Sequence, residues 1–179
     1  MRGLLRVSRV IDAVNDQFGT LANWLVLFAC LISTGNGIAR YAFDIGSNAW
    51  LEVQWYMFAA MVFFGAPYVL KVNEHVRVDV IYSALSERTR IWIDIFGTLF
   101  FLLPFCVVLI YFTWPWFVDS WSISEMSSNA GGLIRWPVKL MLPLGFALLA
   151  LQGISELIKR VAALTDSYRL EYQYETPLQ

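Results

Sequence analysis

Four stretches of this chain run for the thickness of a membrane without a charged side chain. They are residues 17–39, 53–70, 95–118 and 140–155. A helix needs about 20 mostly apolar residues to cross the hydrocarbon core of a bilayer. The pattern therefore predicts an all-α membrane protein with four transmembrane helices, at about residues 20–39, 53–70, 95–118 and 139–156.

The first 18 residues show a different, amphipathic pattern. One stripe of a helix with 3.6 residues per turn holds the apolar side chains of Leu4, Val7, Val10, Ile11, Val14 and Phe18. The opposite stripe holds Arg2, Arg6, Arg9, Asp12 and Asp16. We expect an amphipathic helix that lies in the membrane interface ahead of the first span; a solvated cytoplasmic helix is the alternative. The predicted parts are this helix at 1–18, a transmembrane domain at 19–160 and a polar tail at 161–179.

The lysines and arginines favour one orientation of these spans. Ten of the 13 basic residues lie before the first span, between the second and third spans, or after the fourth. The connections on the other side hold only Arg40, Arg135 and Lys139. Connections rich in lysine and arginine stay on the cytoplasmic side of a membrane. Both termini are therefore predicted to be cytoplasmic.

Composition supports lipid as the solvent and excludes several classes of protein. Hydrophobic residues make up 58% of the chain and charged residues 15%, whereas soluble domains carry about 25% charged residues. A net charge of −1 argues against a nucleic-acid partner, since such proteins show a basic surface. Cys30 and Cys106 lie inside separate apolar runs, so they do not indicate a disulfide framework.

The same spans offer little for transport or catalysis by this chain alone. Membrane proteins that move a substrate usually keep ionisable residues inside the bilayer, and the four charge-free runs have none. The single histidine, His75, cannot supply paired haem ligands or a metal triad. We expect no catalytic residue, no substrate-binding residue, no metal and no cofactor. A self-assembling channel would need a polar face, to which Asn23, Ser33 and Asn36 contribute too little.

Surface for contact with other chains and with membrane lipid is plentiful. Ala29, Ser33 and Gly37 recur every four residues, a strip of small side chains that lets a neighbouring helix approach closely. The third span is crowded with phenylalanine, tyrosine and tryptophan between Phe96 and Trp121. Its aromatic side chains fit an interfacial belt, lipid contact or a second membrane subunit.

Two stretches carry a resemblance to a known family. The first, between spans one and two, contains Asn36, Arg40, Trp50 and Glu52, and the second, after span two, contains Gly65, His75, Arg77 and Asp79. In this order and spacing, across residues 20–160, they resemble the small membrane subunit (DctQ-like) of tripartite ATP-independent periplasmic (TRAP) transporters. Many members carry two adjacent acidic residues after the tryptophan. Here Val53 and Gln54 follow Glu52, so no role for a paired carboxylate is implied.

The resemblance implies an accessory subunit in a bacterial inner membrane. It would act as a scaffold beside a large permease that moves an organic acid with sodium, delivered by a periplasmic solute-binding protein. Arg40 and Glu52 would either pair at the ends of neighbouring helices or remain two solvated charges. His75, Arg77 and Asp79 would interlock the cytoplasmic loop or dock it on the large subunit. The competing interpretation is a membrane-anchored redox or quinone-binding subunit of a respiratory-type complex.

Overall fold

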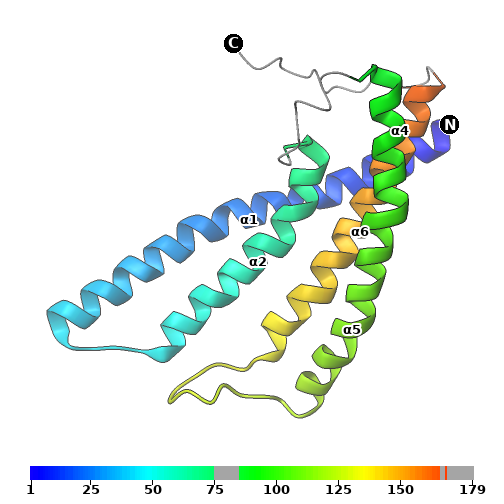
Figure 1. Ribbon diagram of the computed structural model, residues 1–179. Helices are drawn as coiled ribbons and strands as arrows, with labels where there is room; N and C mark the ends of the chain where they lie inside the picture. The colour runs from blue at the N-terminus through cyan, green and yellow to red at the C-terminus, as the bar shows by residue number, and fades with distance from the viewer. Residues whose placement is uncertain (75–84, 166–167, 169–179) are drawn as a thin grey trace.

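The computed structural model describes residues 1–74, 85–165 and 168, and its architecture is helical. In chain order the helices are α1 (Arg2–Phe43), α2 (Asn48–Val72), α4 (Glu87–Gly97), the π-helical η1 (Thr98–Leu102), α5 (Leu103–Ser122) and α6 (Trp136–Leu164) (Figure 1). Among the described residues, four helical stretches are long and apolar enough to cross a membrane: α1, α2, the continuous α4–η1–α5 and α6. The predicted all-α class with four transmembrane helices is confirmed.

The amphipathic N-terminal segment and the first span form one helix. α1 runs for 42 residues without a break at residue 18, which corresponds to about 63 Å at 1.5 Å per residue. It ends at Asp44, which adopts the left-handed conformation with φ 54° and donates its backbone N–H to Ala39. Aspartate tolerates that conformation better than most residues. The position of the first 18 residues in the membrane interface stays a prediction.

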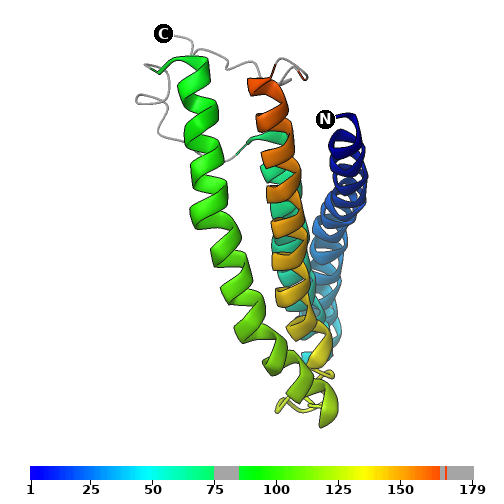
Figure 2. The ribbon, with the colours of Figure 1, turned by 90° about the vertical axis from the view of Figure 1, so that its right-hand side faces the viewer.

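The helices pack as an open row. α5 packs along α6, α6 packs on α2, and α2 packs on α1; the start of α1 also crosses back onto α6. Figure 2 shows α4 and α5 on one side, α6 and α2 in the middle, and α1 on the other side. We call the end where α1 begins and α6 finishes the N-terminal end, and the end where α1 joins α2 and α5 joins α6 the hairpin end (Figure 1).

The apolar core lies where α1, α2 and α6 meet. Ala60, Phe64 and Leu148 are its buried centre, with Phe18 packed against them. α6 approaches α2 so closely at Gly145 that a Cβ there would stand 2.5 Å from the Cβ of Phe63. Only glycine fits at that position. Because lipid gives helices no hydrophobic incentive to associate, such close backbone approach is a main source of their attraction.

Two local signals in the third span are visible in its backbone. Ser86 caps α4 by accepting a hydrogen bond from the backbone N–H of Thr89 at 3.3 Å, and Glu87 occupies the first turn, where a carboxylate interacts favourably with the helix dipole. Further on, the N–H of Leu103 reaches back to the carbonyl of Thr98, five residues away. This π-helical turn precedes Pro104, which has no N–H to continue the normal ladder.

Candidate functional site

Glu52 is the best-supported candidate among the residues predicted from the sequence. It lies in the first turns of α2, is only 3% exposed, and faces the connection between α5 and α6. Ser127 donates its hydroxyl to the carboxylate, the Asn129 amide donates at 2.8 Å and the backbone N–H of Leu133 donates at 2.6 Å. Three donors from one loop therefore satisfy a buried carboxylate, and no lysine or arginine of the described residues forms an ion pair with it.

Arg40 does not take part in this arrangement. Among the residues that the structure describes, no ion pair joins Arg40 to Glu52. Arg40 is exposed in the last turn of α1, where a cation interacts favourably with the negative end of the helix dipole. Neither sequence-based alternative describes Glu52, because it is neither paired with Arg40 nor solvated. The Glu52 carboxylate instead accepts its hydrogen bonds from the loop after α5.

Further contacts fix the same loop to the helices. Asn48 donates to the carbonyl of Ala130 at 3.0 Å, and the Tyr56 hydroxyl donates to the carbonyl of Ile134 at 2.9 Å. These bonds come from the start of α2 and reach both sides of the loop. Together with the three bonds to Glu52 they form the hairpin-end cluster, which holds the α5–α6 connection against α2.

Lys139 completes the hairpin end from the first turn of α6. Its ammonium group forms an ion pair with Glu125 and lies 4.5 Å from the centre of the Trp116 ring, within the range of a cation–π interaction. The hydrogen bond from Lys139 lowers the pKa of the Glu125 carboxyl below its ordinary value. The pair ties the start of α6 to the loop that precedes it.

The remaining predicted residues are dispersed. Asn36 and Gly65 are half-buried and Trp50 is exposed; a Cβ on Gly65 would lie 3.7 Å from that of Ala22. The small-residue strip divides, because Ala29 is buried whereas Ser33 is exposed and a Cβ on Gly37 would meet nothing within 4 Å. His75, Arg77 and Asp79 lie outside the described residues.

A second polar cluster, at the N-terminal end, was not predicted from the sequence. It joins the first turns of α1 to the last turns of α6. Each of the α6 members is at most 5% exposed, and they are Gln152, Ser155, Glu156, Lys159 and Arg160. The members from other helices are Ser8, Asp12 and Asn15 of α1 and Asp94 of α4. We call these nine residues the N-terminal cluster.

Asp12 is the centre of the α1 side of this cluster. Its carboxylate accepts hydrogen bonds from Ser155 at 2.7 Å and from Gln152 at 2.9 Å, and it lies 3.3 Å from the ammonium group of Lys159. The hydroxyls of Ser8 and Ser155 are 2.6 Å apart, a turn before this carboxylate on α1. Asn15 donates to Gln152 at 2.7 Å, a turn after it. Polar side chains thus bond across the helix pair over about two turns.

Glu156 links the other charges of the cluster. It forms ion pairs with Lys159 and with Arg160 on the same helix. Arg160 in turn contacts Asp94 of α4 at 3.1 Å. Three helices, α1, α4 and α6, are therefore joined by alternating charges in a place shielded from water. The arrangement is well suited to holding these three helices together.

A signal for the N-terminal cluster is present in the sequence. The α6 residues 152, 155, 156 and 159 follow the spacing of one helical face, and residues 8, 12 and 15 of α1 do the same. The sequence interpretation treated Glu156, Lys159 and Arg160 as markers of the span's end. α6 instead continues to Leu164, so these charges lie within the helix and face its neighbours.

The polar contacts at both ends join helices of one membrane protein to each other. A comparison with protein families points to the family of such a protein. The family model for the DctQ component of tripartite ATP-independent periplasmic transporters matches residues 29–163. This chain belongs to that family. It is the small permease component of a TRAP transporter, a multi-pass protein of the inner membrane that works with a large permease and a periplasmic binding protein.

The match to the DctQ family covers the hairpin-end cluster and the α6 side of the N-terminal cluster. Ser8, Asp12 and Asn15 precede the matched residues. No curated protein and no solved structure matches the chain. The family gives no support to the alternative of a redox or quinone-binding subunit.

Proposed function

We propose that this DctQ component is the scaffold subunit of a sodium-coupled secondary transporter for an organic acid, a carboxylate or similar anion. The observation that carries the proposal is where the polar contacts lie. The two clusters occupy opposite ends of the helices and join parts of this chain to one another. Between them, the runs 17–39, 53–70, 95–118 and 140–155 contain no charged residue. A site for an anion and a coupling cation needs polar groups in mid-membrane.

The scaffold proposal assigns the movement of the substrate to the large permease. The small subunit would contribute surface, from the exposed aromatic side chains of α4 and α5 and from the outward part of α1 near Ser33 and Gly37. Helix contacts in lipid depend on close packing, and these surfaces lie on opposite sides of the row (Figure 2). A chain anchored in this way can stay fixed while part of its partner moves.

Reconstitution tests this proposal. Liposomes would contain this chain alone, the large permease alone or both, with the solute-binding protein outside and a sodium gradient applied. We expect sodium-dependent uptake of the organic acid only when both membrane subunits are present. Uptake by this chain alone would contradict the scaffold function, and uptake that persists without a sodium gradient would contradict the coupling ion.

The proposed orientation places both termini in the cytoplasm and the hairpin end in the periplasm. It is supported by the distribution of lysine and arginine. Ten of these residues lie before the first span, between the second and third spans or after the fourth, and three lie in the other connections. Reporter fusions that are active only in the periplasm should be silent after Ser86 and active after Gly46 or Ser127. The reverse pattern would contradict the orientation and leave the scaffold function untouched.

A further inference from the structure

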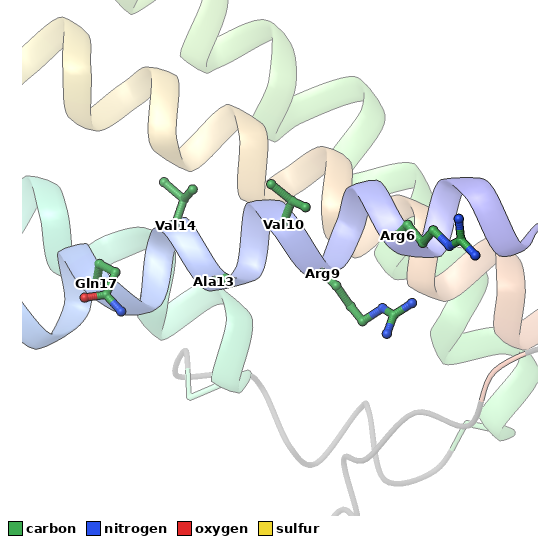
Figure 3. A pocket seen from close by; sticks show the side chains of 6 residues that line it. All are labelled: Arg6, Arg9, Val10, Ala13, Val14 and Gln17. Atoms are coloured by element: carbon green, nitrogen blue, oxygen red, sulfur yellow. The ribbon is translucent and has the colours of Figure 1, made fainter.

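The outward face of the first turns of α1 is hollowed. It lies opposite the face that buries Ser8, Asp12 and Asn15. Six residues of one helical face line a shallow groove of about 560 Å³: Arg6, Arg9, Val10, Ala13, Val14 and Gln17 (Figure 3). The basic side chains lie at the end nearer the N-terminus, and the apolar side chains follow. Val10 is 64% exposed, so the groove shows apolar surface beside charge.

The two arginines of this groove differ from other cations at the same end. Lys71 pairs with Asp16, Lys159 with Asp12, and Arg160 with Asp94. Across the described part of the chain, no carboxylate pairs with Arg6 or Arg9, and both are exposed. Their guanidinium groups are therefore free to bind an external anion. Guanidinium matches the geometry of a phosphate with two parallel hydrogen bonds.

Contacts with neighbouring helices give the depth of the groove. Asp16 pairs with Lys71 at 2.6 Å, and Lys71 is the first charge after the run 53–70. Val14 and Val10 therefore lie near the level where the apolar run of α2 ends. Arg9 and Arg6 lie about two and about three turns beyond Asp16, on the side of the lipid headgroups. Along this face, the apolar side chains therefore lie nearer the acyl region than the two arginines do.

We propose that the groove binds one anionic phospholipid of the adjacent leaflet. Its phosphate would lie between Arg6 and Arg9, and the first part of an acyl chain would lie along Val10, Ala13 and Val14. The order of charged and apolar residues along the groove matches the order of groups along such a lipid. Cations near a membrane surface attract anionic lipids strongly enough to favour them over zwitterionic ones. The lipid would bind residues that precede the segment matched by the family model, 29–163.

The test compares two lipids and two variants of the full-length chain. Retention of dioleoyl phosphatidylglycerol or dioleoyl phosphatidylcholine is measured by native mass spectrometry after delipidation and titration. The variants are R6Q/R9Q and the charge-matched control R40Q/R88Q, whose arginines are also exposed but lie outside the groove. We expect the wild type to prefer phosphatidylglycerol and R6Q/R9Q to lose at least about tenfold in its affinity. The control should stay close to the wild type.

Each other outcome would overturn the proposal. An equal loss in both double variants would indicate unspecific attraction by net charge. Equal retention of the two lipids would show that the groove does not select an anionic headgroup. If R6Q/R9Q instead lowers co-purification of the large permease and leaves phosphatidylglycerol retention unchanged, a protein partner occupies the groove. A charge-conserving R6K/R9K variant separates loss of binding from misfolding, because it keeps both positive charges and should retain the part of the lipid preference that comes from charge, although lysine lacks the paired donors of guanidinium.

Discussion

α6 and the α4–η1–α5 helix are both long and apolar, yet they are used in opposite ways. In the most apolar 18 residues of α6, 39% are buried inside the chain, whereas the corresponding figure for α4–η1–α5 is 6%. α6 touches α1, α2, α4 and α5 and contributes to the polar contacts at both ends. The α4–η1–α5 helix packs chiefly against α6. One helix holds the subunit together, and the other presents aromatic surface to its surroundings.

The largest expected effect is removal of a buried charge from α6. Glu156→Ala leaves Lys159 and Arg160 without their shared partner in a site shielded from water. We expect a loss of about 3–5 kcal/mol in the free energy of unfolding, measured by denaturant titration in detergent. The matched control is Asp119→Ala on α5, where the carboxylate is exposed, and it should change stability by no more than about 0.5 kcal/mol. Equal effects would erase the contrast between the two helices.

Two glycine substitutions, one on α6 and one on α4, test the difference in packing between these helices. Gly145→Ala on α6 places a Cβ 2.5 Å from that of Phe63 and 2.9 Å from its carbonyl oxygen, so it should destabilise the chain by about 1–3 kcal/mol. Gly97→Ala on α4 meets nothing within 4 Å and should stabilise the helix by up to about 1 kcal/mol. Thermal unfolding of the two variants gives the sign of each change. A stabilised Gly145→Ala variant would contradict the close approach of α6 and α2.

An exposed aromatic residue should affect partnership and leave the fold intact. Phe101 is 68% exposed, and Phe101→Ala should change the free energy of unfolding by no more than about 0.5 kcal/mol. If α4–η1–α5 contacts the large permease, the same variant should reduce the free energy of binding to that subunit by more than about 1 kcal/mol. The loss would be seen as weaker co-purification of the two subunits. Unchanged co-purification across Phe96, Phe101 and Phe105 variants would assign this face to lipid.

The smallest expected effect concerns pH at the hairpin end of α6. Because Lys139 holds the pKa of Glu125 below its ordinary value of 4.5, the folded chain binds this proton less tightly than the unfolded chain does. The stability that the pair contributes is therefore present above pH 4.5 and is lost as pH falls through the lower folded value. Glu125→Gln should flatten this part of the pH–stability curve. Unfolding curves recorded from neutral pH downward, with and without the substitution, measure the difference.

The sequence predicted what depends on the bilayer and missed what depends on the approach of helices. Charge-free runs found all four spans, because membrane thickness fixes their length. The partners of Asp12 and Glu52 depend on the tilt of α1 and on a loop more than 70 residues away in the chain. A rule that places every charge at a solvated span end cannot find them. The N-cap at Ser86, by contrast, depends only on residues 86–89, so the local sequence carries its signal.

The open row of helices has a consequence for permeation. A water-filled pore requires helices arranged as a closed ring around a lumen. In the described part of the chain, α5 packs along α6 and makes no substantial contact with α1 or α2, so the row stays open on both broad faces. The described helices of a single copy therefore enclose no conduit. This arrangement agrees with the proposal that the substrate moves through the large permease.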